Sequence, residues 1–131
     1  MSNKVIYALL TGSTAVSAVV GDRIYPVFLP EKVSYPALTY HEITATQIPP
    51  VSASSGLNLI KSRVQVTAFA KNFPTVVDLL ELATREISYA HGEMAGVQVV
   101  SVQPDTRGPD QFDSSSMTAM KAVDFIVTYY S

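Results

Sequence analysis

Few residues of the chain have the types and spacing that acid–base or metal chemistry requires. The two histidines, His41 and His91, lie far apart, there is no cysteine, and neither histidine belongs to an HExxH pattern. Zinc sites draw on Cys, His and carboxylate ligands at short, defined spacings. We therefore expect both histidines to be structural or surface residues, and we predict neither a metal site nor a cofactor.

The polar stretch before the last apolar segment does not form a catalytic pattern either. Ser114–Ser116 lack the glycine-flanked turn of a nucleophile elbow, and Asp105, Asp110 and Asp113 miss the spacing of an EF-hand calcium loop. No glycine-rich phosphate loop is present. This stretch is typical of a solvated acidic loop, and the sequence predicts a protein that is not an enzyme.

One arrangement keeps an enzymatic or ligand-binding alternative open. Tyr40, His41 and Glu42 are consecutive in a segment rich in β-branched and aromatic residues, so a site between the helices and the sheet could use them. No converging acid, base and nucleophile supports this reading. A deep pocket around a shielded, charged His41 would favour it.

Composition indicates one cysteine-free domain spanning residues 1–131. Charged residues make up 15% of the 131 residues, against about 25% in typical globular proteins. A surface so poor in charge indicates that part of it is covered by partner proteins, although an ordinary, slightly apolar domain is the alternative. The net charge of -2, with scattered Lys and Arg, argues against binding along nucleic acid.

Membrane and secretion signals are weak. No segment approaches the ~20 apolar residues of a membrane span. The apolar run Val5–Leu10 is too short for the core of a signal peptide. We expect a cytoplasmic protein with no membrane partner.

Helical periodicity is clearest in the segment from Pro74 to Ala90, where apolar residues fall on one face. Thr75 with Asp78 resembles a capping box for this helix, and Gly92 suits its stop. Two shorter helical pieces at the start cover residues 3–11 and 13–20. Ser13 caps the second piece and Gly21 ends it.

Alternating or β-branched segments predict the strands, with an extended piece at 22–26 that its prolines keep at a sheet edge. The other strands are expected at 37–47, 57–70, 97–103 and 118–130, with flexible loops at 48–56 and 104–116. Sequential antiparallel pairing with the helices on one face is the economical arrangement. The predicted fold class is α+β, an antiparallel sheet in a two-layer sandwich.

The last strand carries apolar residues in both of its registers. Ala122, Ile126 and Tyr130 occupy the register opposite Val123 and its neighbours. Val97, Val99, Val100 and Val102 similarly serve both faces. A second apolar face needs a second cover, either a neighbouring subunit or the loops of the chain itself.

Short motifs near the start carry a family resemblance. The piece Gly21-Asp-Arg-Ile-Tyr-Pro26 follows two helical segments and precedes Ser34-Tyr-Pro-Ala-Leu-Thr-Tyr40. This combination, followed by a long strand, a helix and an aromatic last strand, resembles the tail-completion and tail-terminator family of long-tailed bacteriophages and related prophages. The motif residues are Gly21, Arg23, Ile24, Tyr25, Pro26 and Pro36. These residues also have a structural reading. Gly21 would stop a helix, Arg23 would form a surface ion pair, and Tyr25 and Pro26 would anchor an edge strand.

The resemblance implies a structural virion-assembly protein. Such a protein forms a homo-oligomeric ring, expected to be a hexamer, that stops growth at the head-proximal end of the tail tube. Its partners would be further copies of itself, the major tail tube protein and the head connector or head-closure protein, with DNA only as passing cargo. It would be assembled in the host bacterial cytoplasm and end at the head–tail junction of the virion.

Ring contacts are expected from the excess apolar strand face and from the two loops. The expected interface residues are Ile48, Pro49, Pro50, Val51, Arg107, Phe112, Ile126 and Tyr130. Another ring-forming connector or head-closure protein is the nearest alternative.

Overall fold

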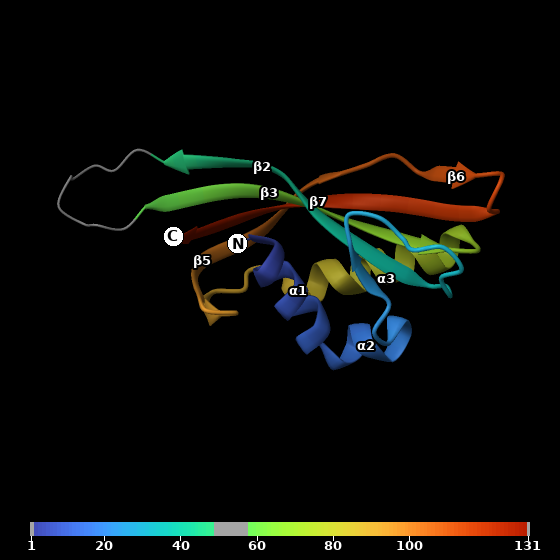
Figure 1. Cartoon of the computed structure of the whole chain (residues 1–131), viewed down its shortest axis with the longest axis horizontal. Helices are drawn as coiled ribbons and strands as arrows, with labels where there is room; N and C mark the ends of the chain where they lie inside the picture. Colours follow the sequence, from blue (N-terminus) through green and yellow to red (C-terminus); the bar gives the residue numbers. More distant parts are fainter. Residues whose placement is uncertain (1, 49–57, 131) are drawn as a thin grey trace.

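A curled sheet with helices on one face makes up the part of the chain that the computed structural model describes, residues 2–48 and 58–130 (Figure 1). The helices are α1 (Ser2–Gly12), α2 (Thr14–Val20) and α3 (Phe73–Ile87). The strands are β1 (Ile24–Pro26), β2 (Ala37–Ile48), β3 (Leu59–Ala70), β4 (Gly92–Met94), β5 (Val97–Arg107), β6 (Gln111–Asp113) and β7 (Thr118–Tyr130). The predicted α+β class, with helices on one face of the sheet, is confirmed.

The strand order in the sheet is β1-β2-β3-β7-β5-β4, and β6 pairs with β7 beside the end of β5. All of these pairings are antiparallel except that of β1 with β2, which is parallel. The long strands β3 and β7 pair without interruption from Leu59 with Tyr130 to Ala70 with Ala119. Together they form the centre of the sheet, and β1 and β4 lie at its opposite edges.

The hydrophobic core lies between the helices and the inner face of the sheet. Alternate residues of β3 and β7, such as Val64, Val66 and Phe125, are fully buried there. The helices contribute their own apolar stripes, including Ile6 of α1 and Leu80 of α3. Each large apolar side chain that is fully buried stabilises the fold by about 1.5–3 kcal/mol.

Both caps of α2 follow the sequence prediction. The Ser13 side chain accepts a hydrogen bond from the Val16 N–H (3.2 Å) at the start of α2. Gly21 ends α2 with φ 59°, a backbone conformation that residues with a Cβ rarely adopt. No single helix among the described residues is long and apolar enough to span a membrane; α1 and α2 reach that length only as a pair, bent by 83°.

The boundaries of α3 differ from the prediction. Its N-cap is Asn72, whose Oδ1 accepts from the Thr75 N–H (2.9 Å), so the predicted capping box of Thr75 with Asp78 is wrong. The reason is Pro74, which fits the first turn because its missing N–H needs no partner there. The helix also stops at Ile87, before the predicted end and without using Gly92, which lies in β4.

The segment 104–116, predicted to be a flexible loop, contains the end of one strand and a second, short strand. β5 continues to Arg107, and Gln111–Asp113 form β6, both paired with β7. The prediction failed because Pro104 was read as a strand end, whereas the sheet tolerates it at an edge, followed by a bulge before Arg107. Of the other predicted loop, only Ile48 is described, as the last residue of β2; residues 49–56 lie outside the described residues.

Candidate interaction surfaces

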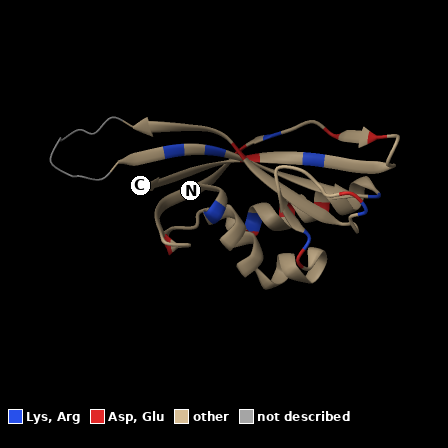
Figure 2. Ribbon diagram, viewed as in Figure 1, with Lys and Arg blue, Asp and Glu red and all other residues tan. Residues whose placement is uncertain are grey.

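The outer face of the sheet, which none of the described helices covers, carries an ion-pair network at its centre. Arg63 of β3 lies 2.7 Å from Asp105 of β5 and 3.1 Å from Asp124 of β7, and the Gln65 side chain donates to Asp124 (3.3 Å). The hydrogen bond from Arg63 holds the pKa of Asp105 below its ordinary value. Figure 2 shows basic (blue) and acidic (red) segments close together where the central strands cross. The centre of this face is therefore polar.

The prediction of a second apolar face is wrong at that centre. In β5 a bulge between Val99 and Ser101 shifts the register by one residue. Val97, Val99 and Val102 are therefore all buried, and only Val100 is exposed. In β7, the side chain of Ile126 lies in the outer register and is half-buried.

One end of the outer face does gather predicted interface residues. Ile48 pairs with Leu59, and Leu59 pairs with Tyr130. Cross-strand partners share a face, so these three side chains form an apolar row, with Tyr130 39% exposed. Ile126 lies on the same face of β7. Pro49, Pro50 and Val51 lie outside the described residues.

The other two predicted interface residues lie elsewhere. Phe112 of β6 is half exposed and packs against Phe73, with ring centroids 6.4 Å apart. Arg107 pairs with Val123, whose side chain is in the buried register, so it belongs to the helical side of the sheet. The structure thus divides the predicted set among three places.

The motif residues join α2 to the first two strands. Arg23 Nε donates to the Pro36 carbonyl (2.9 Å), and the Arg23 carbonyl accepts from the Leu38 N–H (3.0 Å). Pro36 follows a cis peptide bond. The predicted surface ion pair of Arg23 is wrong, because its guanidinium is hydrogen-bonded to backbone carbonyls.

The remaining motif residues build the edge strand itself. Ile24, Tyr25 and Pro26 form β1 and pair with Leu38, Thr39 and Tyr40. Ile24 is buried in the core. The predicted roles of Gly21 as a helix stop and of Tyr25 and Pro26 at an edge strand are confirmed, so the motif fixes where the helical layer meets the sheet.

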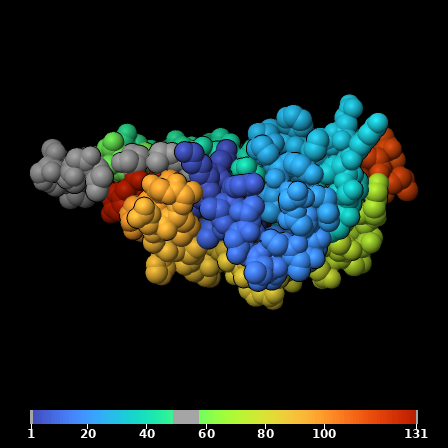
Figure 3. Space-filling view, turned by 60° about the horizontal axis from the view of Figure 1, so that its bottom comes forward, coloured from blue at the N-terminus to red at the C-terminus, as the bar shows by residue number. Residues whose placement is uncertain are grey.

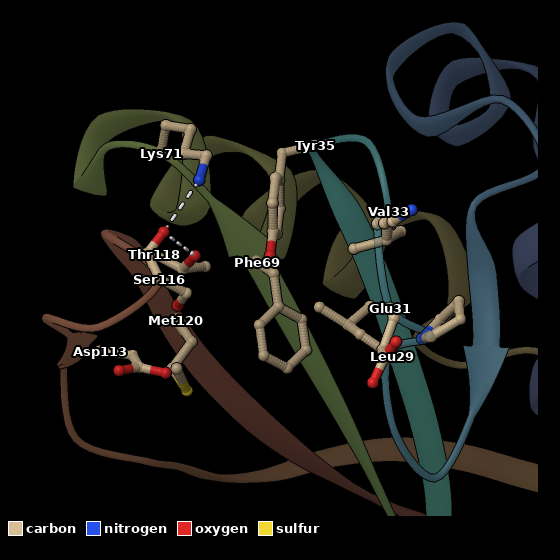
Figure 4. Close-up of a pocket in the computed structure, with 12 residues that line it drawn as sticks. Leu29, Glu31, Val33, Tyr35, Phe69, Lys71, Asp113, Ser116, Thr118 and Met120 are labelled. Atoms are coloured by element: carbon tan, nitrogen blue, oxygen red, sulfur yellow. Dashed lines mark hydrogen bonds between the residues drawn. The ribbon is translucent and has the colours of Figure 1, made fainter.

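A hollow of about 410 Å³ lies between the segment after β1 and the turn between β6 and β7 (Figure 4). Tyr35, Phe69 and Met120 line it with apolar surface. Lys71 Nζ donates to the Ser116 carbonyl (2.9 Å) and lies 4.6 Å from the centre of the Tyr35 ring. The lining is mixed, because charged side chains such as Glu31 and Asp113 share it with these apolar ones.

A second hollow, of about 520 Å³, lies between the end of α3 and β5. Arg85 and Tyr89 line it from the helix side, and Pro104 and Arg107 from the strand. Tyr89 is 71% exposed, although it follows a buried helix end. Arg85 and Tyr89 were missed in the sequence analysis, because nothing in the sequence at the end of a helix indicates a hollow that a distant strand helps to form.

The segment after β1 carries the other feature that was missed. Val27 and Phe28 are 60% and 72% exposed. The sequence signal was the run of three apolar residues Val27–Leu29 between Pro26 and Pro30, in a stretch with no helical or strand periodicity. Exposed apolar residues in such a place are typical of contact surfaces.

The residues of the enzymatic alternative do not converge. Tyr40 points to the helices, where burial raises its pKa and its ring packs 5.7 Å from that of Tyr7. Adjacent strand residues face opposite sides of a sheet, so His41 points the other way. Glu42 accepts a hydrogen bond from the Ser62 hydroxyl (3.0 Å). In the described ranges, no group of three or more His, Asp or Glu side chains could hold a metal ion.

The fold and these surfaces define a class of protein: an α+β domain whose conspicuous features are exposed apolar and aromatic side chains at the sheet edges, suited to contact with other proteins. The family model of tail completion protein gp17 matches residues 4–126. The chain belongs to this family, as its motifs predicted, and it is a structural protein of a phage-type tail.

Solved structures share the fold. Nineteen chains match, among them a chain of a structure described as the virion of native gene transfer agent (GTA) particle. The two chains superpose with a TM-score of 0.70 over 96% of this chain and 92% of the other, at 11% sequence identity. At that identity the likeness concerns the fold. No curated protein sequence matches the chain.

Proposed function

We propose that this chain forms a ring at the head-proximal end of a tail tube, stops growth of the tube and joins the tail to the head connector. Membership of the tail completion family over residues 4–126 carries the proposal. The ring is a homo-oligomer, with six copies as the expected number. Its neighbours are the major tail tube protein on one side and a head connector or head-closure protein on the other.

The two sides of the sheet support a head-to-tail arrangement. Beyond Tyr40, the edge of β2 that points away from β3 pairs with no described strand. From Ser101 to Arg107, the edge of β5 that points away from β7 also pairs with no described strand, although the Val102 carbonyl there accepts from the Tyr89 N–H. Unpaired strand edges are ready sites for pairing with another chain. A repeating ring needs two different contact surfaces on each copy, and open edges on opposite sides of one sheet provide them.

Electron microscopy of particles that lack this protein tests the role. Tails of uncontrolled length beside unattached heads are expected for a terminator. Normal tails beside heads that have lost their DNA would instead indicate a head-closure protein. The protein is assembled in the host cytoplasm under this proposal and remains at the head–tail junction.

Charge substitutions test whether the outer face takes part in the ring. Ile126→Asp and Tyr130→Asp are each expected to weaken self-association and leave the fold largely intact, because both side chains lie on the uncovered face. Size-exclusion chromatography with light scattering measures the oligomer, and Ala18→Asp on the exposed side of α2 is the control. An unchanged oligomer with a normal circular dichroism spectrum would remove these residues from the interface.

DNA is proposed only as passing cargo. The net charge of -2 suits a lumen that does not hold DNA tightly. Filter binding of the purified protein to duplex DNA is expected to show weak association. Tight binding that falls steeply with salt would contradict this part of the proposal.

A further inference from the structure

An aromatic side chain is presented to solvent by a constrained turn at one edge of the sheet. The Phe28 N–H donates to the Pro26 carbonyl (2.8 Å), and the Val27 N–H donates to the Tyr40 carbonyl (2.9 Å). These bonds close a turn in which Val27 has φ 69°. Positive φ is costly for a β-branched residue, and such strained positions cluster at functional sites. The strain here leaves Phe28 72% exposed.

The hollow beside β5, at the other edge, offers flat surfaces to a ring of this kind. Tyr89 has φ 65° and its N–H donates to the Val102 carbonyl (2.6 Å), which fixes its backbone against β5. Arg85 and Arg107 form no ion pair with a described residue. Aromatic faces, proline rings and unpaired guanidinium groups all pack favourably on an aromatic ring. At about 520 Å³ the hollow has room for one.

The two features lie on opposite edges of the same sheet. Four strand steps separate β1 from β5, or about 19 Å at the usual strand spacing. Figure 3 shows the segment after β1, in light blue, on one side of the N-terminal helices and the β4–β5 region, in orange, on the other. Phe28 therefore cannot reach the hollow of its own chain, whereas a copy placed edge to edge can.

We infer that Phe28 of one copy inserts into the hollow lined by Arg85, Tyr89, Pro104 and Arg107 of the next copy, and that this contact repeats around the ring. The inference rests on the proposed ring, and it names the surfaces that close it. A second copy is the occupant because one edge carries the projecting side chain and the opposite edge carries the cavity. That placement is what head-to-tail repetition requires.

The competing seat for Phe28 is the hollow of Figure 4. Leu29, the next residue, lines that hollow, so Phe28 and the hollow lie side by side. A mutual exchange there would make a two-fold pair of copies. Such a pair closes on itself and does not propagate a ring.

Disulfide trapping tests the contact, since the chain contains no cysteine. The double variant Phe28→Cys/Tyr89→Cys is oxidised in solution and examined on non-reducing gels. A disulfide needs Cα atoms within about 7 Å, so the two cysteines cannot pair within one chain. Because the disulfide is covalent, oxidation traps even transient contacts between copies, and the linked products accumulate. A ladder of covalent oligomers is expected.

Single variants and a matched pair complete the design. An equimolar mixture of Phe28→Cys and Tyr89→Cys should give dimers only, and each variant alone should give none. Phe112→Cys/Tyr89→Cys is the control, because β6 and β5 border the same side of β7 and cannot face each other in a head-to-tail contact. This control pair should not form a ladder.

The outcomes separate this inference from the proposed function. A double variant that stays monomeric with a native circular dichroism spectrum, or Phe28→Cys alone dimerising as well as the mixture, overturns the inference. If the wild-type chain still forms rings in electron micrographs, the proposed function stands. A covalent product that stops at the dimer, from an assembly that closes with two copies, would keep the contact and overturn the ring.

Discussion

Replacing Gly21 by alanine tests the backbone geometry that links the helical layer to β1. Gly21 has φ 59° and ψ -125°, and its N–H donates to the Ser17 carbonyl (2.8 Å) at the end of α2. A Cβ at this position would meet only Arg23 Nη1, at 3.7 Å, which is an ordinary contact. The cost of the substitution therefore comes from the backbone conformation and not from crowding.

The magnitude follows from two opposing effects. A residue with a Cβ in a sparsely populated backbone region costs about 1–3 kcal/mol. Alanine also restricts the unfolded chain, which offsets about 0.4–1 kcal/mol. We expect Gly21→Ala to lower the free energy of unfolding by about 1–2 kcal/mol.

Gly12 provides the matched control. It is the last residue of α1, its φ is not positive, and nothing lies within 4 Å of a Cβ built there. Only the effect on the unfolded chain remains, so Gly12→Ala should raise the free energy of unfolding by about 0.4–1 kcal/mol. The same substitution is thus expected to have opposite signs at two sites near each other in the chain.

Urea unfolding followed by circular dichroism measures both variants. With a urea dependence of about 2 kcal/mol per M, the midpoint should fall by about 0.5–1 M for Gly21→Ala. For Gly12→Ala it should rise by a few tenths of 1 M. The reasoning is refuted if the Gly21 variant unfolds at or above the wild-type midpoint, or if both variants shift in the same direction.

Three further predictions concern the helix cap, the core and the ion-pair network. Asn72→Ala should destabilise the fold by about 1 kcal/mol in thermal melts, whereas Asn72→Asp keeps an acceptor for the first turn and should not. Phe125→Ala, at a fully buried site, should cost about 3–5 kcal/mol in urea unfolding, and a cost below 1 kcal/mol would contradict the packing. Arg63→Met should lower the urea midpoint at pH 7. The folded-state pKa of Asp105 lies below its unfolded value, so the stabilisation from its pair with Arg63 is present above the unfolded pKa and is lost as pH falls through the folded pKa. The difference in urea midpoint between the wild type and Arg63→Met should therefore close below about pH 4. A difference that stays constant with pH would refute this reasoning.

Local patterns were sufficient to predict most of the elements. The apolar stripe of α3 and the alternation in β3 report directly which side chains face the core. The capping role of Ser13 and the stop at Gly21 were predictable because few residue types satisfy those positions. The N-cap Asn72 was missed because Thr75 and Asp78 offered a competing pattern three residues on.

Long-range pairing decided what the sequence alone did not predict. Pro104 signals the end of a strand, but β7 extends far enough to pair with β5 beyond it and with β6. The bulge after Val99 likewise has no local signature, so the faces of β5 were assigned wrongly. Register depends on the partner strand, and a shift of one residue exchanges the faces.

The candidate surfaces were only partly predictable for the same reason. Ile48 and Tyr130 were singled out by their apolar character, and the register of β2, β3 and β7 brings them together. Phe28 was overlooked because its exposure depends on a positive φ at Val27, where no glycine marks the turn. A hollow such as that beside Tyr89 exists only after α3 and β5 are placed together.

The uninterrupted pairing of β3 with β7 has a consequence for how the protein is made. The two central strands lie at residues 59–70 and 119–130, so β3 leaves the ribosome well before its partner is synthesised. Until then it can pair only with β2, and the inner residues Val64 and Val66 have an incomplete sheet around them. Non-local pairing of this kind folds slowly and leaves apolar strands accessible in the meantime. The newly made chain is therefore expected to depend on chaperone protection until β7 completes the sheet.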